Sequence, residues 1–172
     1  MAEEFIGIDL GGTNLKLGIV ENERVTTRLS VPTEADKGPD HVIGVICNAV
    51  RQLCEKASVD LDQVAGIGIG APGPLDHMQG EIIFAPNLPG WRHIPLRDSM
   101  MKDLGRPVVL ENDANVAAYA EFRAGAGRGK NSLALFTLGT GIGGGFIIDG
   151  KMIRGENDCG AEVGHTIIVY CF

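Results

Sequence analysis

The fold is decided by the stretch Asp9-Leu10-Gly11-Gly12-Thr13, which closes an apolar, strand-like run at residues 5–10. A similar stretch, Gly139-Thr140-Gly141-Ile142-Gly143-Gly144-Gly145, follows a second apolar run at residues 133–138. A gap-free alignment of the two pairs Leu10 with Leu138, Gly11 with Gly139, Ile19 with Ile147 and Asn22 with Gly150. Glycine tolerates positive φ and lets an anion approach the backbone closely. The repeat therefore predicts two related lobes, each presenting backbone N–H groups to a phosphate.

The composition favours a folded protein in a reducing compartment. The chain has 172 residues, of which 44% are hydrophobic, so it can bury a core. Its net charge of −7 argues against a nucleic-acid-binding or membrane-binding surface, and no apolar stretch approaches the length of a membrane span. Cys47 and Cys54 share one face of an expected helix and are predicted to be buried free thiols, which fits a cytoplasmic protein.

The order of expected elements predicts an α/β fold with a mixed sheet and helices on both faces. We expect strands at residues 5–10, 15–21, 24–31, 64–71 and 108–110, and helices at residues 39–57, 95–104 and 112–124. Residues 75–94 read as an irregular loop. Residues 1–125 would then form a first lobe, and residues 126–172 would form the beginning of a second.

The first glycine turn carries side chains suited to a metal ion and a phosphate group. Asp9 at a strand end can hold Mg²⁺ through water, and Thr13, Asn14 and Lys16 can contact phosphate oxygens. The alternative is a plain hairpin turn with an unrelated Asp. The turn is neither a Walker A loop nor a dinucleotide fingerprint, because the strand leads to a second strand rather than to a helix.

A second polar group, Glu111-Asn112-Asp113-Ala114-Asn115, lies where a strand is expected to meet a helix. Helix capping would account for one of these side chains, but not for three in succession. A carboxylate at a strand end is well placed to act as a general base toward a substrate hydroxyl. We therefore predict that Asp113 is the catalytic base.

Two further candidates could bind sugar hydroxyls. Glu162 and His165 lie three residues apart with Gly164 between them, and Asn87 lies in the segment Ala85-Pro86-Asn87-Leu88-Pro89-Gly90-Trp91. Considered alone, Glu162 and His165 are ordinary surface residues and Asn87 is an ordinary turn residue. They become ligands only where these segments line a binding site.

Together these motifs resemble the ROK family of bacterial repressors, open reading frames and sugar kinases, above all its ATP-dependent glucokinases. The resemblance rests on the two glycine turns, the Pro72-Gly73-Pro74 turn, Asn87-Leu88-Pro89-Gly90-Trp91, Glu111-Asn112-Asp113-Ala114-Asn115 and Glu162-x-Gly164-His165. It implies two ribonuclease H-like lobes of the actin-like ATPase and hexokinase superfamily, with the sugar in the cleft. It also implies Asp113 as the base, Asn87, Asn112, Glu162 and His165 as sugar ligands, and Gly11, Gly12, Thr13, Gly139, Thr140, Gly141 and Gly143 as nucleotide-phosphate contacts.

The chain departs from the family pattern near its end. In the family, Glu-x-Gly-His precedes a Cys-x-Cys-Gly-x-x-Gly-Cys-x-Glu segment whose cysteines bind a structural Zn²⁺ with the His. Here His165 is followed by Thr-Ile-Ile-Val-Tyr-Cys-Phe. One His and Cys171 cannot make a tetrahedral zinc site, so we expect no zinc in this chain, which is either truncated or divergent at its end.

The resemblance implies transfer of the γ-phosphoryl group of MgATP to the 6-hydroxyl of a hexose, with glucose the first candidate. The strand that begins at Phe5 leaves no room for an N-terminal DNA-binding domain, which favours a kinase over a repressor. The alternatives are a non-catalytic sugar sensor and an actin-like or chaperone ATPase. The resemblance implies a homodimer for full-length members, and we expect little activity from these 172 residues alone. Mannose, N-acetylmannosamine and fructose stay open as substrates.

Overall fold

The computed structural model describes residues 3–139 and 141–166, and the chain divides into two compact units, Met1–Asp113 and Ala114–Phe172. The boundary falls at the first turn of the third helix, α3 (Asp113–Ala124), whereas the sequence analysis expected it after residue 125. Among the described residues, no helix is both long and apolar enough to cross a membrane.

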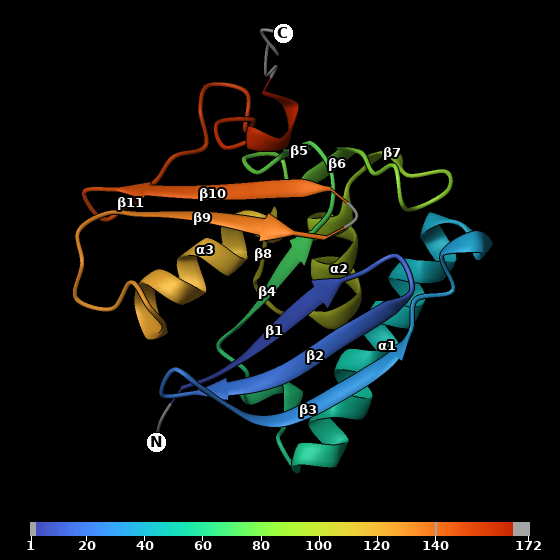
Figure 1. Ribbon diagram of the computed structural model, residues 1–172. Coiled ribbons are helices and arrows are strands. Elements are labelled where there is room, and N and C mark those ends of the chain that lie inside the picture. Colours follow the sequence, from blue (N-terminus) through green and yellow to red (C-terminus); the bar gives the residue numbers. More distant parts are fainter. Residues whose placement is uncertain (1–2, 140, 167–172) are drawn as a thin grey trace, which may run out of the picture. The chain divides into compact units, whose positions relative to one another are not determined.

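The first unit is built on a five-stranded sheet in the order β3-β2-β1-β4-β8 (Figure 1). Its strands are β1 (Glu4–Leu10), β2 (Asn14–Glu21), β3 (Arg24–Pro32), β4 (Gly66–Ala71) and β8 (Val108–Asn112). The first three form an antiparallel meander, and β4 and β8 run parallel to β1. The prediction of an α/β fold with a mixed sheet is confirmed.

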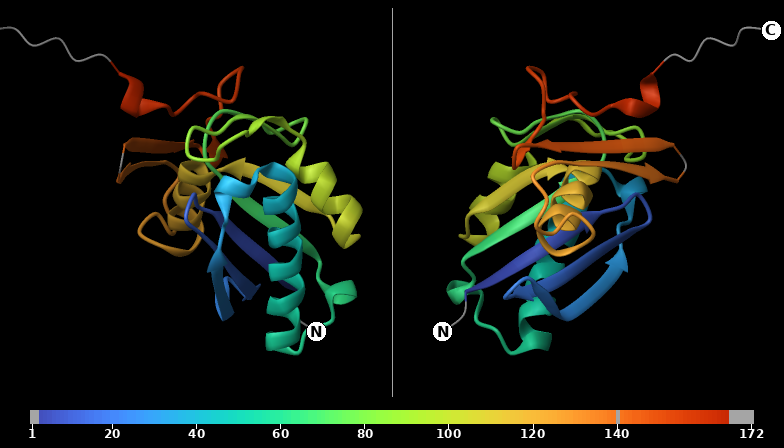
Figure 2. Two further views of the ribbon diagram at one scale, coloured as in Figure 1. Left: turned by 90° about the vertical axis from the view of Figure 1, so that its right-hand side faces the viewer. Right: turned by 60° about the vertical axis from the view of Figure 1, so that its left-hand side comes forward.

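Helices α1 (Pro39–Ala57) and α2 (Leu96–Leu104) pack on one face of this sheet, and Figure 2 shows α1 along that face. The burial pattern of β1 shows why: Ile6, Ile8 and Leu10 point into the core, while the residues between them do not. Alternation with a period of two is the signature of a strand buried on one side. The sequence predicted helices on both faces of the sheet, but within this unit α1 and α2 lie on the same face.

A second, smaller sheet in the order β5-β6-β7 occupies the segment that the sequence analysis treated as irregular, so that prediction was wrong. The strands are β5 (Leu75–Asp76), β6 (Glu81–Phe84) and β7 (Arg92–Ile94). They align Leu75 with Ile82 and Ile82 with Ile94, which gives one apolar row across the sheet. Strands of two to four residues are too short to show alternation in the sequence.

The second unit contains α3 and a three-stranded antiparallel sheet in the order β11-β10-β9. Its strands are β9 (Leu133–Leu138), β10 (Ile142–Ile148) and β11 (Lys151–Met152). A Cβ added at Gly145 of β10 would lie 2.5 Å from the Cβ of Ala118 on α3. This close approach of small residues explains why α3 groups with the second unit.

Candidate functional site

The first glycine turn joins β1 to β2 and is open on one side. The N–H of Gly11 donates to the carbonyl of Asn14 over 3.2 Å, and Gly12, Thr13 and Asn14 are exposed. Thr33, at the end of β3, donates from its hydroxyl to the carbonyl of Gly11 over 2.6 Å. The sequence analysis did not single out Thr33. A threonine after Pro32 gives no sign in the sequence that its hydroxyl will contact a turn so distant in the chain.

Asp9 and Lys16 face each other across this hairpin. They are direct partners in the β1–β2 register, and Lys16 Nζ lies 3.4 Å from Asp9 Oδ2. Both side chains are more than half exposed, at 55% for Asp9 and 69% for Lys16. An exposed pair of this kind adds little to stability, so both groups stay available to a ligand.

The carboxyl ends of the parallel strands bring further predicted site residues to the same edge of the sheet. Asp9 on β1 is paired with Gly70 on β4, and Gly70 is paired with Glu111 on β8. Asn112 ends β8, and the exposed Asp113 is the first residue of α3. In open α/β sheets, ligands bind at the carboxyl ends of the strands. Asp113 also lies in the first helical turn, where the helix dipole stabilises a carboxylate.

Asn87 lies beside the first glycine turn. Its loop is closed by a hydrogen bond of 3.2 Å from the N–H of Ala85 to the carbonyl of Trp91, and buried Leu88 and Trp91 anchor it to the core. A Cβ added at Gly12 would lie only 3.1 Å from the carbonyl oxygen of Asn87. The glycine therefore allows the two segments to lie against each other, with the Asn87 side chain exposed.

The second unit repeats the strand–turn–strand geometry. β9 and β10 are joined by residues 139–141, with Leu138 paired to Ile142 and the N–H of Gly139 donating to the carbonyl of Gly141 over 2.9 Å. Thr140 lies outside the described residues. Gly143 is part of β10 rather than of the turn, and it is paired with Thr137.

Glu162 precedes a short 3-10 helix (Val163–His165) that packs against β10, and His165 is the last residue of that helix. A Cβ added at Gly164 would lie 2.1 Å from the carbonyl oxygen of Ile142, so only glycine lets this segment lie so close to the start of β10. Glu162 Oε2 lies 3.9 Å from His165 Nε2, and both side chains are exposed. The second unit thus brings the Glu-x-Gly-His segment next to its own glycine turn.

The cysteines behave as free thiols. Cys47 and Cys54 are buried free thiols, as predicted, and Cys159 is an exposed free thiol. Burial, followed by the nearby Asp103 carboxylate, raises the pKa of Cys47 to about 12. Residues 3–139 and 141–166 contain no cluster of three or more His, Cys, Asp or Glu side chains that could hold a metal ion. Cys171 lies outside the described residues, and the absence of zinc stays a prediction.

Comparison with known proteins decides the family. The model of the ROK family matches residues 5–170. The chain belongs to the ROK family. It is 37% identical over 166 residues to the glucokinase of Thermotoga maritima, a match that covers 96% of this chain and 51% of that protein. The chain therefore spans about half the length of the curated relatives it matches.

Two solved ROK structures resemble this one closely. A glucokinase from Streptomyces griseus, in complex with glucose and AMPPNP, matches with a TM-score of 0.85 and 42% identity over 96% of this chain and 51% of its own. A hexokinase from Thermus thermophilus matches with a TM-score of 0.87 and 39% identity over 96% of this chain and 54% of its own. The predicted ribonuclease H-like fold class is thereby confirmed.

Proposed function

We propose that this chain carries the sugar-phosphorylating residues of an ATP-dependent hexose kinase that acts on the 6-hydroxyl of glucose. The observation that supports this most is the shared sheet edge of the first unit. There the glycine turn, Asp9, Asn112 and Asp113 lie at the carboxyl ends of β1 and β8, and Asn87 lies against the turn. The resemblance to a glucokinase that binds glucose and AMPPNP supports the same reaction.

Asp113 is the general base in this proposal. It takes the proton of the attacking sugar hydroxyl as the oxygen forms a bond to the γ-phosphorus, while the bond to the ADP oxygen breaks. It lies in the first turn of α3, where the helix dipole favours the carboxylate that accepts this proton. Asn112 and Asn87 would bind neighbouring hydroxyls and orient the sugar.

The first glycine turn would contact the nucleotide phosphates. Gly11, Gly12, Thr13 and Asn14 offer backbone and side-chain donors on the open side of the turn, and Lys16 offers a cation. Asp9 fits a Mg²⁺ ion held through water, because its carboxylate is exposed at a strand end, and such ions keep most of their water. Mg²⁺ would neutralise charge on the transferring phosphoryl group.

The second unit would supply the remaining contacts. Glu162 and His165 are proposed as sugar ligands, supported by their exposure and by the close fit of Gly164 against Ile142. Gly139, Thr140 and Gly141 of the second turn are proposed as phosphate contacts, together with Gly143 near the start of β10.

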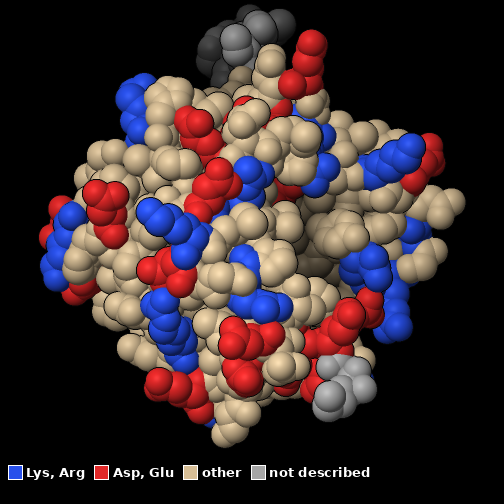
Figure 3. Space-filling view, turned by 180° about the vertical axis from the view of Figure 1, so that it is seen from behind, with Lys and Arg blue, Asp and Glu red and all other residues tan. Residues whose placement is uncertain are grey.

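The proposed partners are small molecules. Acidic and basic side chains are interspersed on the face seen in Figure 3, and the net charge is −7, which supports a sugar and a nucleotide rather than nucleic acid. A cytoplasmic location, and a homodimer in full-length relatives, belong to the same proposal. The structural Zn²⁺ expected of full-length relatives is not proposed for this chain.

A chimera tests the function. Residues 1–166 would be joined to the part of the Streptomyces griseus glucokinase that this chain does not cover, with that glucokinase as the positive control. We expect ADP to form only when glucose is present. Hydrolysis of ATP at the same rate without sugar would support an ATPase, and sugar binding without turnover by a folded chimera would support a sensor.

A further inference from the structure

Thr33 is a fully buried polar residue beside the exposed glycine turn. Its exposed fraction is 0%. In the described part of the chain, Asn115 is the only other buried polar residue. It directly follows Pro32, the last residue of β3, and β3 is the neighbour of β2 in the sheet. A buried hydroxyl needs a hydrogen-bond partner, and the Thr33 hydroxyl has its partner in the glycine turn.

Two hydrogen bonds connect Thr33 to the turn. Its hydroxyl donates to the carbonyl of Gly11 over 2.6 Å, and its N–H donates to the carbonyl of Thr13 over 2.9 Å. Both bonds draw carbonyl oxygens toward Thr33, into the protein. Two of the three peptide units between Gly11 and Asn14 are therefore held by this one residue.

This arrangement sets the direction of the N–H groups. The peptide bonds of the turn are trans, so the N–H of each unit points opposite to its carbonyl. With the carbonyls of Gly11 and Thr13 directed at Thr33, the N–H groups of Gly12 and Asn14 point away from it. Gly12 and Asn14 lie on the exposed side, where N–H groups attract an anion.

The other side of the turn is bounded by the Asn87 loop. A Cβ added at Gly12 would lie 3.1 Å from the carbonyl oxygen of Asn87, so the Asn87 loop lies close to the turn on that side. Loss of the Thr33 hydroxyl would therefore free the Gly11 carbonyl to rotate, and the Gly12 N–H would rotate with it.

We propose that Thr33 is a positioning residue that fixes the Gly12 and Asn14 N–H groups for the phosphates of a nucleotide. This role rests on the proposed kinase function and adds a residue to it. Thr33 does not touch the nucleotide. It acts through the Gly11 and Thr13 carbonyls.

Two substitutions separate the hydroxyl from the rest of the side chain. Thr33→Val keeps the shape and removes the donor, whereas Thr33→Ser keeps the donor. Loss of one buried hydrogen bond corresponds to about a tenfold change in affinity. We therefore expect AMPPNP with Mg²⁺ to bind Thr33→Val about tenfold more weakly than the unmodified chain, as measured by calorimetry, and to bind Thr33→Ser nearly as tightly.

Thr26→Val is the matched control. Thr26 lies on β3, the strand that precedes Thr33, and its hydroxyl donates to the carbonyl of Ile19 over 3.4 Å, away from the turn. Its substitution should leave nucleotide affinity unchanged. Equal losses in Thr26→Val and Thr33→Val would show a general effect on β3 and would overturn the role of Thr33.

Amide hydrogen exchange in the unmodified chain gives a second test that needs no variant. Bound AMPPNP should slow exchange at Gly12 and Asn14, and unchanged exchange at both would overturn the proposal. If the unmodified chain binds AMPPNP and a folded Thr33→Val variant binds it equally well, only the role of Thr33 fails. If the unmodified chain binds no AMPPNP, nucleotide binding by this chain fails as well, and the role of Thr33 fails with it.

Discussion

The two units start from the same strand–glycine turn–strand repeat, but only the first completes a sheet around it. In the first unit, β1 is hydrogen-bonded to β2 on one side and to β4 on the other. In the described part of the second unit, β9 pairs with β10 alone. The aligned leucines show the consequence, since Leu10 is 1% exposed and Leu138 is 82% exposed. The repeat alone therefore does not form a hydrophobic core. A core forms only where a flanking strand and helices cover the repeat.

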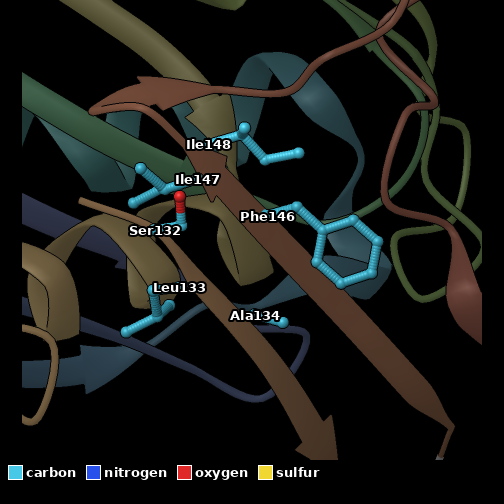
Figure 4. A pocket seen from close by; sticks show the side chains of 6 residues that line it. All are labelled: Ser132, Leu133, Ala134, Phe146, Ile147 and Ile148. Carbon is cyan, nitrogen blue, oxygen red and sulfur yellow. The ribbon is translucent and has the colours of Figure 1, made fainter. Parts of the chain in front are cut away.

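The second unit has apolar side chains exposed on its surface. Phe136, Ile142 and Ile148 are each more than half exposed. A hollow of about 380 Å³ lies over the paired ends of β9 and β10 that are far from the glycine turn (Figure 4). It is lined by Ser132, Leu133, Ala134, Phe146, Ile147 and Ile148. Exposed apolar side chains gathered on one sheet favour association with other chains.

The largest expected effect is on kcat, which a substitution in the first unit should lower, whereas a substitution in the second unit should mainly change KM. In the chimera, Asp113→Asn should lower kcat by about a hundred- to ten-thousand-fold, because the sugar hydroxyl loses its base. Glu162→Gln should mainly raise KM for glucose. Steady-state kinetics at saturating ATP measure both. Near-normal kcat with Asn at position 113 would remove Asp113 from the reaction.

The aligned leucines test the difference in packing. Leu10→Ala should lower the free energy of unfolding by about 2–5 kcal/mol, because it leaves a cavity in the core. Leu138→Ala should change it by less than about 0.5 kcal/mol, because that side chain is already in water. Urea denaturation of the two variants measures both values. Similar losses for the two would mean that Leu138 is covered.

Much of the first unit could be predicted from the sequence, because its long elements carry regular patterns. The helix at residues 39–57 was predicted with the bounds the structure gives it, and the five strands of the sheet were predicted with bounds within two residues of those observed. The strands β5, β6 and β7 were missed, because each is too short for a pattern. The placement of α3 in the second unit depends on Ala118 meeting Gly145, a contact between distant residues.

Some residues of the candidate site could likewise be predicted from the sequence, and others could not. Motifs such as Asp9-Leu10-Gly11-Gly12-Thr13 indicate their chemistry through residue type and order, and their roles stay predictions. Thr33 could not be found from the sequence, because its contact with Gly11 exists only once β3 has paired with β2.

Association of the chain tests the exposed surface of the second unit. We expect the 172-residue chain to self-associate, through the open edge of β9 and the apolar side chains beside it. Leu138→Lys should reduce association, whereas Val109→Lys, an exposed position on β8 of the first unit, is the matched control. Size-exclusion chromatography over a range of concentrations measures this. A monomer at every concentration would contradict the expectation.

The smallest expected effect is on metal content. After dialysis, the chain should hold less than a stoichiometric amount of zinc, because the His165 segment lacks the cysteines that would complete a tetrahedral site. Elemental analysis measures the ratio. One tightly held zinc per chain would reveal ligands that the sequence pattern does not predict.

The most direct test of the account is the identity of the product. The chimera would be incubated with glucose and MgATP, and the phosphorus-containing products would be followed by ³¹P NMR. The account predicts glucose 6-phosphate and ADP in equal amounts, with neither formed by the Asp113→Asn variant. Inorganic phosphate and ADP without sugar phosphate, from a folded chimera that binds both substrates, would contradict it.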